Sequence, residues 1–185
     1  MRIAYFTETL PPLVDGVART LSHLVETLEN HKVDFRFYSP VRPDASLAWR
    51  HRVRKVPALP FLPYRGYRIG LPFLAPLITD LDHFQPDLIH VVNPTLLGLR
   101  GLIYGRHRHI PVVSSYHTHF VFYFNYHGFN SAEKIGWSYL KWFHNQCNMT
   151  YAPSSRATLA RFMSTHLGQW AFWERFWESG SGYRS

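Results

Sequence analysis

Hydrophobic and polar residues alternate along the chain with two periods, and their order predicts strands separated by helices. Residues 2–6 and 33–38 are short runs rich in aromatic and β-branched side chains, which is typical of buried strands. Between them, apolar residues recur at helical spacing, which predicts a helix that begins at Val17 and ends at Glu29-Asn30-His31. Its buried face is expected to contain Leu21, Leu24, Val25 and Leu28.

The same alternation continues towards residue 163. Helices are expected at residues 71–83, 95–107, 132–146 and 154–163, and strands at residues 88–92, 111–115 and 149–152. Residues 42–70, rich in Pro and Arg, are expected to be irregular apart from a short strand at residues 53–56. Strands that alternate with helices favour parallel pairing. The sequence therefore predicts an α/β fold, a Rossmann-like parallel sheet with helices on both faces.

The length of 185 residues fits one domain of ordinary size. The single cysteine, Cys147, excludes an internal disulfide, and the chain opens on a strand-like run without an apolar signal region. We therefore expect a reducing, cytoplasmic compartment. Because no apolar run approaches the roughly 20 residues of a membrane-spanning helix, any membrane contact is expected to be peripheral.

The charge balance is basic, with 20 Lys and Arg against 12 Asp and Glu and a net charge of +8 with neutral histidines. The basic residues cluster at residues 50–55, 65–68 and 106–109. Nucleic acid, anionic lipid headgroups and sugar phosphates all fit such clusters, and so do ordinary solvated surfaces.

Ligands of parallel α/β sheets bind where the strands end, so the loops after residues 6, 92, 115 and 152 are the candidate site. The first loop lacks the G-x-G-x-x-G of dinucleotide-binding enzymes, which argues against a nicotinamide or flavin enzyme. It contains Asp15, Gly16 and Val17 at the start of a helix, where backbone N–H groups favour a phosphate and Gly16 permits close approach. A glycine before a helix is also ordinary turn chemistry.

The loop after residue 115 begins Tyr116-His117-Thr118-His119. A histidine at this position can exchange a proton or bind a sugar hydroxyl near neutral pH. His117 and His119 also fit metal ligands, but no Cys, Asp or Glu clusters with them, so no metal is expected. Ordinary core or surface histidines are the remaining alternative.

Residues 120–129 hold many aromatic side chains, which indicates core filling or a wall that contacts an acceptor or lipid. Further along, Pro153-Ser154-Ser155 precedes an expected helix, and Ser154 or Ser155 is typical of an N-cap.

Several of these segments match one family in order and spacing. They are Pro11-Pro12 with Asp15-Gly16-Val17, residues 86–90 with Asn93-Pro94, residues 110–113 with 116–119, Trp142-Phe143-His144 and Pro153-Ser154-Ser155. Together they resemble the N-terminal domain of family 4 glycosyltransferases of GT-B fold, the group that includes bacterial mannosyltransferases and sulfoquinovosyl-lipid synthases. The resemblance extends from residue 2 to about residue 163 and assigns residues 1–163 to one half of a GT-B fold.

The resemblance implies transfer of a sugar from a nucleotide-diphosphate sugar to an acceptor, such as a lipid or glycolipid, with retention of configuration and without a metal or other cofactor. The loop at Gly16 would approach the donor phosphates. His117 would lie beside the reacting sugar, position its hydroxyls and support charge in the transition state. Pocket-lining positions would be Asn93, Thr118, Tyr123 and Ser154.

After residue 163 the sequence departs from the family, whose members continue into a second Rossmann-like domain that holds most donor contacts. Residues 164–185 instead form an aromatic and then Ser/Gly-rich tail. A truncated or frame-shifted product is favoured, with a poorly ordered tail. A membrane-contacting helix through Trp170, Trp173 and Trp177, or a surface for a missing second chain, are alternatives.

Because catalysis would need both domains, the chain alone is expected to lack turnover. The rival functions are a basic, aromatic module that binds membrane surfaces and a split-enzyme subunit. Nucleic-acid binding ranks third, since no recognisable motif accompanies the charge.

Overall fold

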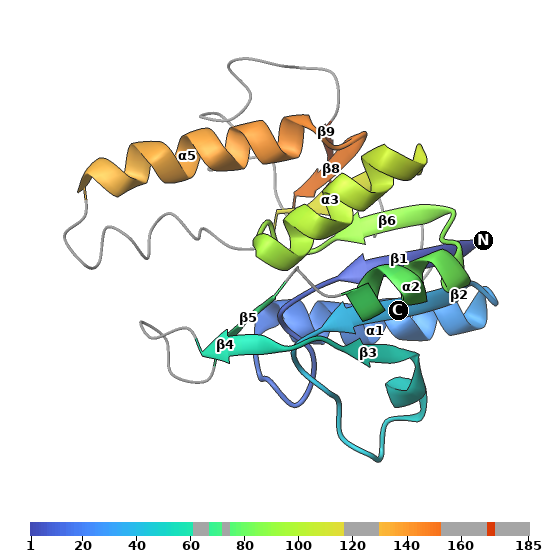
Figure 1. Ribbon diagram of the computed structural model, residues 1–185. Helices are drawn as coiled ribbons and strands as arrows, with labels where there is room; N and C mark the ends of the chain where they lie inside the picture. The colour runs from blue at the N-terminus through green and yellow to red at the C-terminus, as the bar shows by residue number, and fades with distance from the viewer. Residues whose placement is uncertain (61–66, 72–74, 117–129, 153–169, 173–185) are drawn as a thin grey trace, which may run out of the picture. The chain divides into compact units, whose positions relative to one another are not determined.

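The structure is a computed structural model that describes residues 1–60, 67–71, 75–116, 130–152 and 170–172 (Figure 1). The chain divides into two compact units, Met1–Val112 and Val113–Ser185. The strands are β1 (Arg2–Phe6), β2 (Asp34–Ser39), β3 (Val53–Lys55), β4 (Ala58–Pro60), β5 (Arg68–Gly70), β6 (Leu88–Val91), β7 (Val112–Ser115), β8 (Met149–Ala152) and β9 (Trp170–Phe172). The helices are α1 (Gly16–Asn30), the short 3-10 helix η1 (Ala48–Arg52), α2 (Ala75–Phe84), α3 (Leu96–Arg108) and α5 (Asn130–Asn145).

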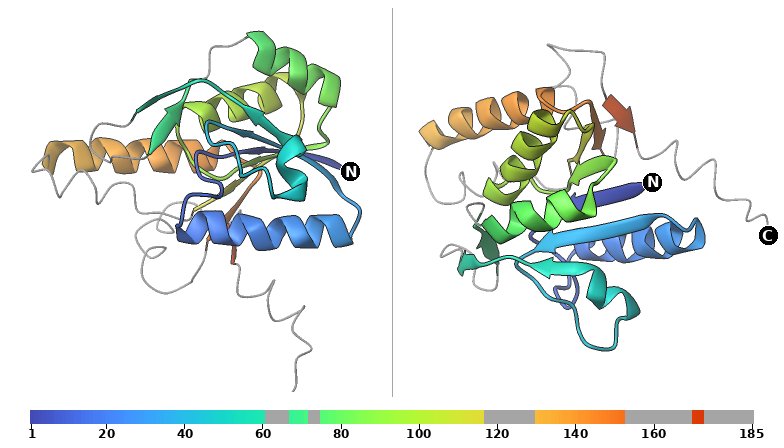
Figure 2. Two further views of the ribbon diagram at one scale, coloured as in Figure 1. Left: turned by 90° about the horizontal axis from the view of Figure 1, so that it is seen from below. Right: turned by 45° about the vertical axis from the view of Figure 1, so that its right-hand side comes forward.

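The sheet of the first unit is parallel, with its strands in the order β3-β2-β1-β6. The central strand β1 pairs Ile3 with Phe35 of β2 on one side and with Leu88 of β6 on the other. In this unit, helix α1 lies on one side of the strands, and α2 and α3 lie on the other (Figure 2). The predicted Rossmann-like sheet with helices on both faces is therefore confirmed.

The two faces of this sheet follow from the alternation of side chains along the strands. Ile3 and Tyr5 of β1 point to the same face as Phe35 and Phe37 of β2. These four side chains form one core cluster with the buried residues of α1. The members that α1 contributes are Val17, Leu21, Val25 and Leu28, with Leu24 packed against them. The apolar face predicted for this helix is therefore confirmed.

The opposite face of the sheet is packed closely by α3. A Cβ atom at Gly101 would lie 2.7 Å from the ring of Phe6 in β1. A Cβ atom at Gly105 would lie 2.4 Å from the Val112 side chain. Such separations are well inside van der Waals contact, so the helix can approach the strands this closely because these positions have no side chain.

The expectation of an irregular segment at residues 42–70 is partly wrong. Strand β3 is present as predicted, one residue shorter, but η1 precedes it and buries Trp49 against Phe37 at a ring-centroid distance of 5.7 Å. Strands β4 and β5 form an antiparallel pair that matches Ala58 with Gly70. Because each of these strands has three residues, neither is long enough to show a period in the sequence.

In the second unit, β7, β8 and β9 form parallel pairs in that order. Strand β9 lies in the segment for which a membrane-contacting helix was one expectation, and that expectation is wrong for Trp170. Trp173, Trp177 and the helix predicted at residues 154–163 lie outside the described residues. No helix in the described ranges is long and apolar enough to cross a membrane.

Candidate functional site

Strands β1 and β6 are parallel neighbours, so the loops that follow them leave the same edge of the sheet, which we call the carboxyl edge. The pairing extends past the strands, because the Val92 N–H donates to the Phe6 carbonyl at 2.9 Å. The next residues of both loops, 7–10 and 93, are buried. Polar side chains are therefore enclosed where a ligand of such a sheet would bind.

Asn93 joins these two loops. Its side-chain Oδ1 accepts a hydrogen bond from the Thr7 hydroxyl at 3.0 Å and from the Glu8 N–H at 3.1 Å. Asn93 is 2% exposed, and its carbonyl accepts from the Thr95 N–H at 2.9 Å. The side chain predicted to line a pocket thus holds the loop after β1 in place.

Glu8 is the titratable group of this edge. Its side chain is fully buried, the Thr95 hydroxyl donates to Oε1, and Oε2 has no hydrogen-bond partner in the described part of the chain. Burial raises the pKa of Glu8 to about 8, although hydrogen bonds from Thr95 and from backbone N–H groups act in the opposite direction. The carboxyl is therefore mostly protonated at neutral pH.

The loop after β1 ends at the N-terminus of α1, where three predicted site residues lie. The Asp15 carboxylate caps the helix by accepting from the Ala18 N–H at 2.7 Å. Val17 is 8% exposed and belongs to the core, so any ligand contact would come through its backbone. A Cβ atom at Gly16 would meet no atom of the described residues within 4 Å, so there is open space beside this position.

The other predicted site residues cannot be placed. His117, Thr118, Tyr123 and Ser154 lie outside the described residues, as does His119. The last described residue before His117 is Tyr116, whose ring lies 5.8 Å from that of His144. Among the described residues, no group of three or more His, Cys, Asp or Glu side chains is arranged to hold a metal ion.

Sequence reasoning missed Thr7, Glu8 and Thr95. A signal was present, because three polar residues, Thr-Glu-Thr, follow directly after the apolar strand β1. Their partners lie more than 80 positions away in the chain, so the sequence did not show what they contact.

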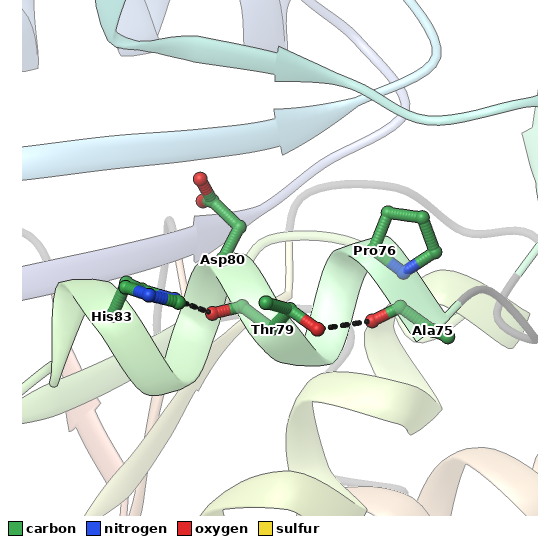
Figure 3. A pocket seen from close by; sticks show the side chains of 5 residues that line it. All are labelled: Ala75, Pro76, Thr79, Asp80 and His83. Atoms are coloured by element: carbon green, nitrogen blue, oxygen red, sulfur yellow. Dashed lines mark hydrogen bonds between the residues drawn. The ribbon is translucent and has the colours of Figure 1, made fainter.

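A separate hollow lies along α2, lined by Ala75, Pro76, Thr79, Asp80 and His83 (Figure 3). Two of its polar side chains bind the helix itself: Thr79 donates to the Ala75 carbonyl at 3.1 Å, and His83 Nδ1 lies 2.7 Å from the Thr79 carbonyl. Asp80 accepts from two arginines and a tyrosine on the sheet. The polar groups of this hollow are therefore occupied by structural bonds.

Known proteins are similar to this chain in sequence and in fold. The GDP-mannose-dependent alpha-mannosyltransferase of Mycolicibacterium smegmatis is 27% identical over 162 residues, which cover 85% of this chain and 43% of that protein. The alpha-monoglucosyldiacylglycerol synthase of Streptococcus pneumoniae is 29% identical over 126 residues, covering 68% of this chain and 29% of that protein. Sucrose-phosphate synthase from Thermosynechococcus elongatus matches with a TM-score of 0.61 at 17% identity, covering 92% of this chain and 47% of that one.

The chain thus spans less than half the length of each of these three proteins. The structural match shows a shared fold, and the expectation of one half of a GT-B fold is confirmed. The family described as Glycosyltransferase Family 4 matches residues 14–166, which include Gly16, Asn93 and His117. Since this match covers most of the sequence, the chain belongs to glycosyltransferase family 4.

Proposed function

We propose that the chain forms the acceptor-side half of an enzyme that transfers a hexose from a nucleotide-diphosphate sugar with retention of configuration. Residues 1–163 would form this half, and residues 164–185 an atypical tail. The observation that carries the proposal is the open position at Gly16, at the helix N-terminus that follows β1 and inside the region of the family match. Backbone N–H groups at a helix N-terminus favour a phosphate, and no side chain at Gly16 obstructs one.

The proposed roles divide between binding and chemistry. The Gly16 loop would approach the donor diphosphate, and His117 would position sugar hydroxyls and support positive charge near the reacting carbon. Thr118, Tyr123 and Ser154 would line the acceptor pocket. Asn93 would support the pocket by holding the loop after β1, because its Oδ1 already accepts two hydrogen bonds from that loop. We expect no metal or other cofactor to be required.

The names of two relatives support the proposed substrate class. One is a GDP-mannose-dependent alpha-mannosyltransferase and the other an alpha-monoglucosyldiacylglycerol synthase. We therefore propose a nucleotide-diphosphate hexose as donor and a lipid-linked or sugar acceptor, used at the cytoplasmic face of a membrane.

The proposal is tested by joining this chain to the second half of a relative, which the chain does not span. The complete chain would be assayed with radiolabelled GDP-mannose and UDP-glucose and a bacterial lipid extract, both alone and after residues 1–163 are fused to the second half of the M. smegmatis relative. We expect no turnover by the chain alone and transfer by the fusion, with EDTA having no effect. NMR of the product would assign its anomeric configuration.

Variants separate chemistry from folding in this fusion. His117→Ala is expected to abolish transfer while the circular dichroism spectrum stays unchanged, and His23→Ala, exposed on α1, serves as the matched control. A folded fusion that binds donor but transfers to neither lipid nor sugar would count against the transferase assignment. An inverted product would leave transfer intact and reject retention.

We also propose peripheral contact with an anionic membrane. The last turn of α3 exposes Arg106, His107 and Arg108, and a named relative makes a glycolipid. The chain should co-sediment with vesicles containing phosphatidylglycerol at low salt and be released by salt, because screening weakens exposed charges. Equal binding to neutral vesicles would exclude this electrostatic contact.

A further inference from the structure

The buried cluster at the carboxyl edge contains one acid whose role the proposed transfer reaction does not explain. Glu8 is fully buried, so it cannot itself touch a sugar or phosphate held in the open part of the site. Its contacts are instead with the loop after β6 and with the start of α3, the segments that border the open part of the site. Its N–H donates to Asn93 Oδ1 after β6, and its carboxyl accepts from Thr95 at the start of α3.

The bond from Thr95 is informative because of where Thr95 lies. It is the N-cap residue of α3, and an N-cap hydroxyl usually accepts a hydrogen bond from the first turn of its own helix. Here the Thr95 side chain makes no such cap bond and donates to Glu8 Oε1 instead. The start of α3 is therefore attached to the loop after β1, 87 positions earlier in the sequence.

The surroundings of the carboxyl favour its neutral form. The groups that face it are the Thr95 hydroxyl from the start of α3 and backbone N–H groups of the β1 loop and of Gly70 in β5, and none of these carries a charge. No charged side chain in the described part of the chain contributes to its pKa. An ionised carboxylate here would be a buried charge without a counter-ion, which is costly.

We propose that Glu8 is a positioning residue, a neutral carboxyl that holds the loop after β1 and the N-terminus of α3 in one arrangement through Asn93 and Thr95. This inference rests on the proposed function, because these two loops flank the proposed donor site. Loss of the proton at alkaline pH would place a charge in the cluster and loosen both loops. The transfer reaction would then have an alkaline limit set by a residue that does not touch substrate.

The first measurement is made on the complete chain without any sugar. Glutamate carboxyl carbons are followed by ¹³C NMR between pH 3 and pH 10, with the Glu8 signal assigned by its absence in Glu8→Gln. We expect the Glu8 carboxyl to titrate near pH 8, well above its ordinary value of 4.5. A Glu8 signal that titrates together with the exposed glutamates would overturn the proposal.

The second measurement reports position rather than charge. Amide hydrogen exchange, corrected for intrinsic rates, is compared at pH 6 and pH 9 for residues 7–10 and 93–99, with β2 as the internal reference. The wild-type loops should lose at least roughly tenfold in protection at pH 9, because ionisation then places an uncompensated charge in the cluster and one pH unit corresponds to a factor of ten for a single titrating group. Glu8→Gln keeps an acceptor for Thr95 without the charge and should show no such loss.

Two further variants keep the proposal open to refutation. Glu8→Ala should lower loop protection at both pH values, and Thr95→Val, which removes the donor and keeps Glu8, should lower protection of residues 93–99. Glu26→Gln, exposed on α1, should behave as wild type. Wild-type protection of residues 7–10 in Glu8→Ala would overturn the proposal, as would wild-type behaviour of Thr95→Val.

These outcomes are independent of the transferase assay. The positioning role would stand if the fusion protein failed to transfer sugar while the loops lost protection as expected. Conversely, an active fusion whose loops ignored Glu8 would preserve the proposed function and reject this inference.

Discussion

The carbonyl oxygen of Asn93 lies so close to Gly98 that a Cβ atom at position 98 would be 2.1 Å away from it. The same atom would lie 2.6 Å from the Val91 side chain. The first turn of α3 is therefore pressed against the loop after β6. Because one contact is backbone, a side chain at this position cannot be accommodated by a change of rotamer.

Gly98→Ala should therefore destabilise the chain despite the better helix propensity of alanine. We expect a loss of about 1–3 kcal/mol in the free energy of unfolding, the usual range for overpacking. Urea denaturation followed by circular dichroism measures this change. A variant as stable as wild type would mean that α3 can move away from the loop at little cost.

Gly16→Ala is the matched substitution with the opposite expectation. Gly16 also occupies the first turn of a helix, but a Cβ atom there would meet nothing within 4 Å. The free energy of unfolding should change by less than about 1 kcal/mol, since only helix propensity differs. Transfer by the fusion protein should nevertheless fall at least roughly tenfold, if a phosphate approaches the backbone there. A stable and fully active variant would remove Gly16 from the donor site.

The sequence predicted the order of strands and helices because each long element has a period of its own. Leu21, Val25 and Leu28 recur at helical spacing, and their burial on one face of α1 follows from that spacing. The hairpin of β4 and β5 was missed because three residues cannot show a period. The glycines of α3 were compatible with a helix in the sequence. Their role in letting α3 approach β1 and β6 closely could be recognised only in the structure.

The loops of the candidate site could be selected from the sequence, but their contacts could not. The rule that ligands bind where parallel strands end selected the loops after β1 and β6, and the family resemblance named Asn93. The structure shows that Asn93 is buried and bonded to the loop after β1, and its role in a pocket stays a prediction. The contacts of Asn93 depend on Thr7 and Glu8, which are 85 or more positions away. These residues come together because β1 and β6 are neighbours in the sheet, and local sequence patterns do not predict which strands are neighbours.

Asp80 on α2 is expected to be the most sensitive surface acid of the first unit. Its carboxylate accepts from Arg36 at 2.9 Å, from the Tyr38 hydroxyl at 2.8 Å and from Arg54 Nε at 2.9 Å. Partial burial raises the pKa of Asp80, but the hydrogen bonds from Arg54, Tyr38 and Arg36 outweigh it and hold the pKa below its ordinary value. Asp80→Asn should cost about 2 kcal/mol of unfolding free energy, because three hydrogen bonds lose a charged acceptor.

Asp34→Asn is the control for this prediction. Asp34 also pairs with an arginine, Arg52, at 2.7 Å, but its side chain is 56% exposed and this is a single ion pair. Exposed pairs contribute little, so the loss should be below about 1 kcal/mol in the same urea titration. Equal effects of the two substitutions would show that the network around Asp80 adds nothing to a simple ion pair.

His144 in α5 gives the second unit a sensitivity to acid. Its side chain is buried, Nδ1 lies 2.9 Å from the Ser114 hydroxyl, and burial lowers the pKa of His144 to about 4. An unfolded histidine titrates near 6.5, so between about pH 6.5 and pH 4 the unfolded chain binds more protons. The stability contributed by the neutral ring is therefore present above pH 6.5 and lost as the pH falls towards 4.

Glu8 acts with the opposite sign, because its folded pKa of about 8 lies above its ordinary value of 4.5. Its contribution is complete below pH 4.5 and declines as the pH rises towards 8. Between pH 4.5 and pH 6.5 the two dependences oppose each other, so the wild-type unfolding free energy should vary little there. Above pH 6.5 the decline due to Glu8 should appear alone.

Removing Glu8 should therefore reveal the effect of His144. In Glu8→Gln, the unfolding free energy should fall between pH 6.5 and pH 4.5 by up to about 1.4 kcal/mol per pH unit, the limit for one titrating group. Adding His144→Asn should abolish this fall, whereas adding His23→Asn, exposed on α1, should leave it intact. If the unfolding free energy of Glu8→Gln did not change with pH in this window, the His144 ring would have to bind its proton equally in the folded and unfolded chains. Burial would then not lower its pKa.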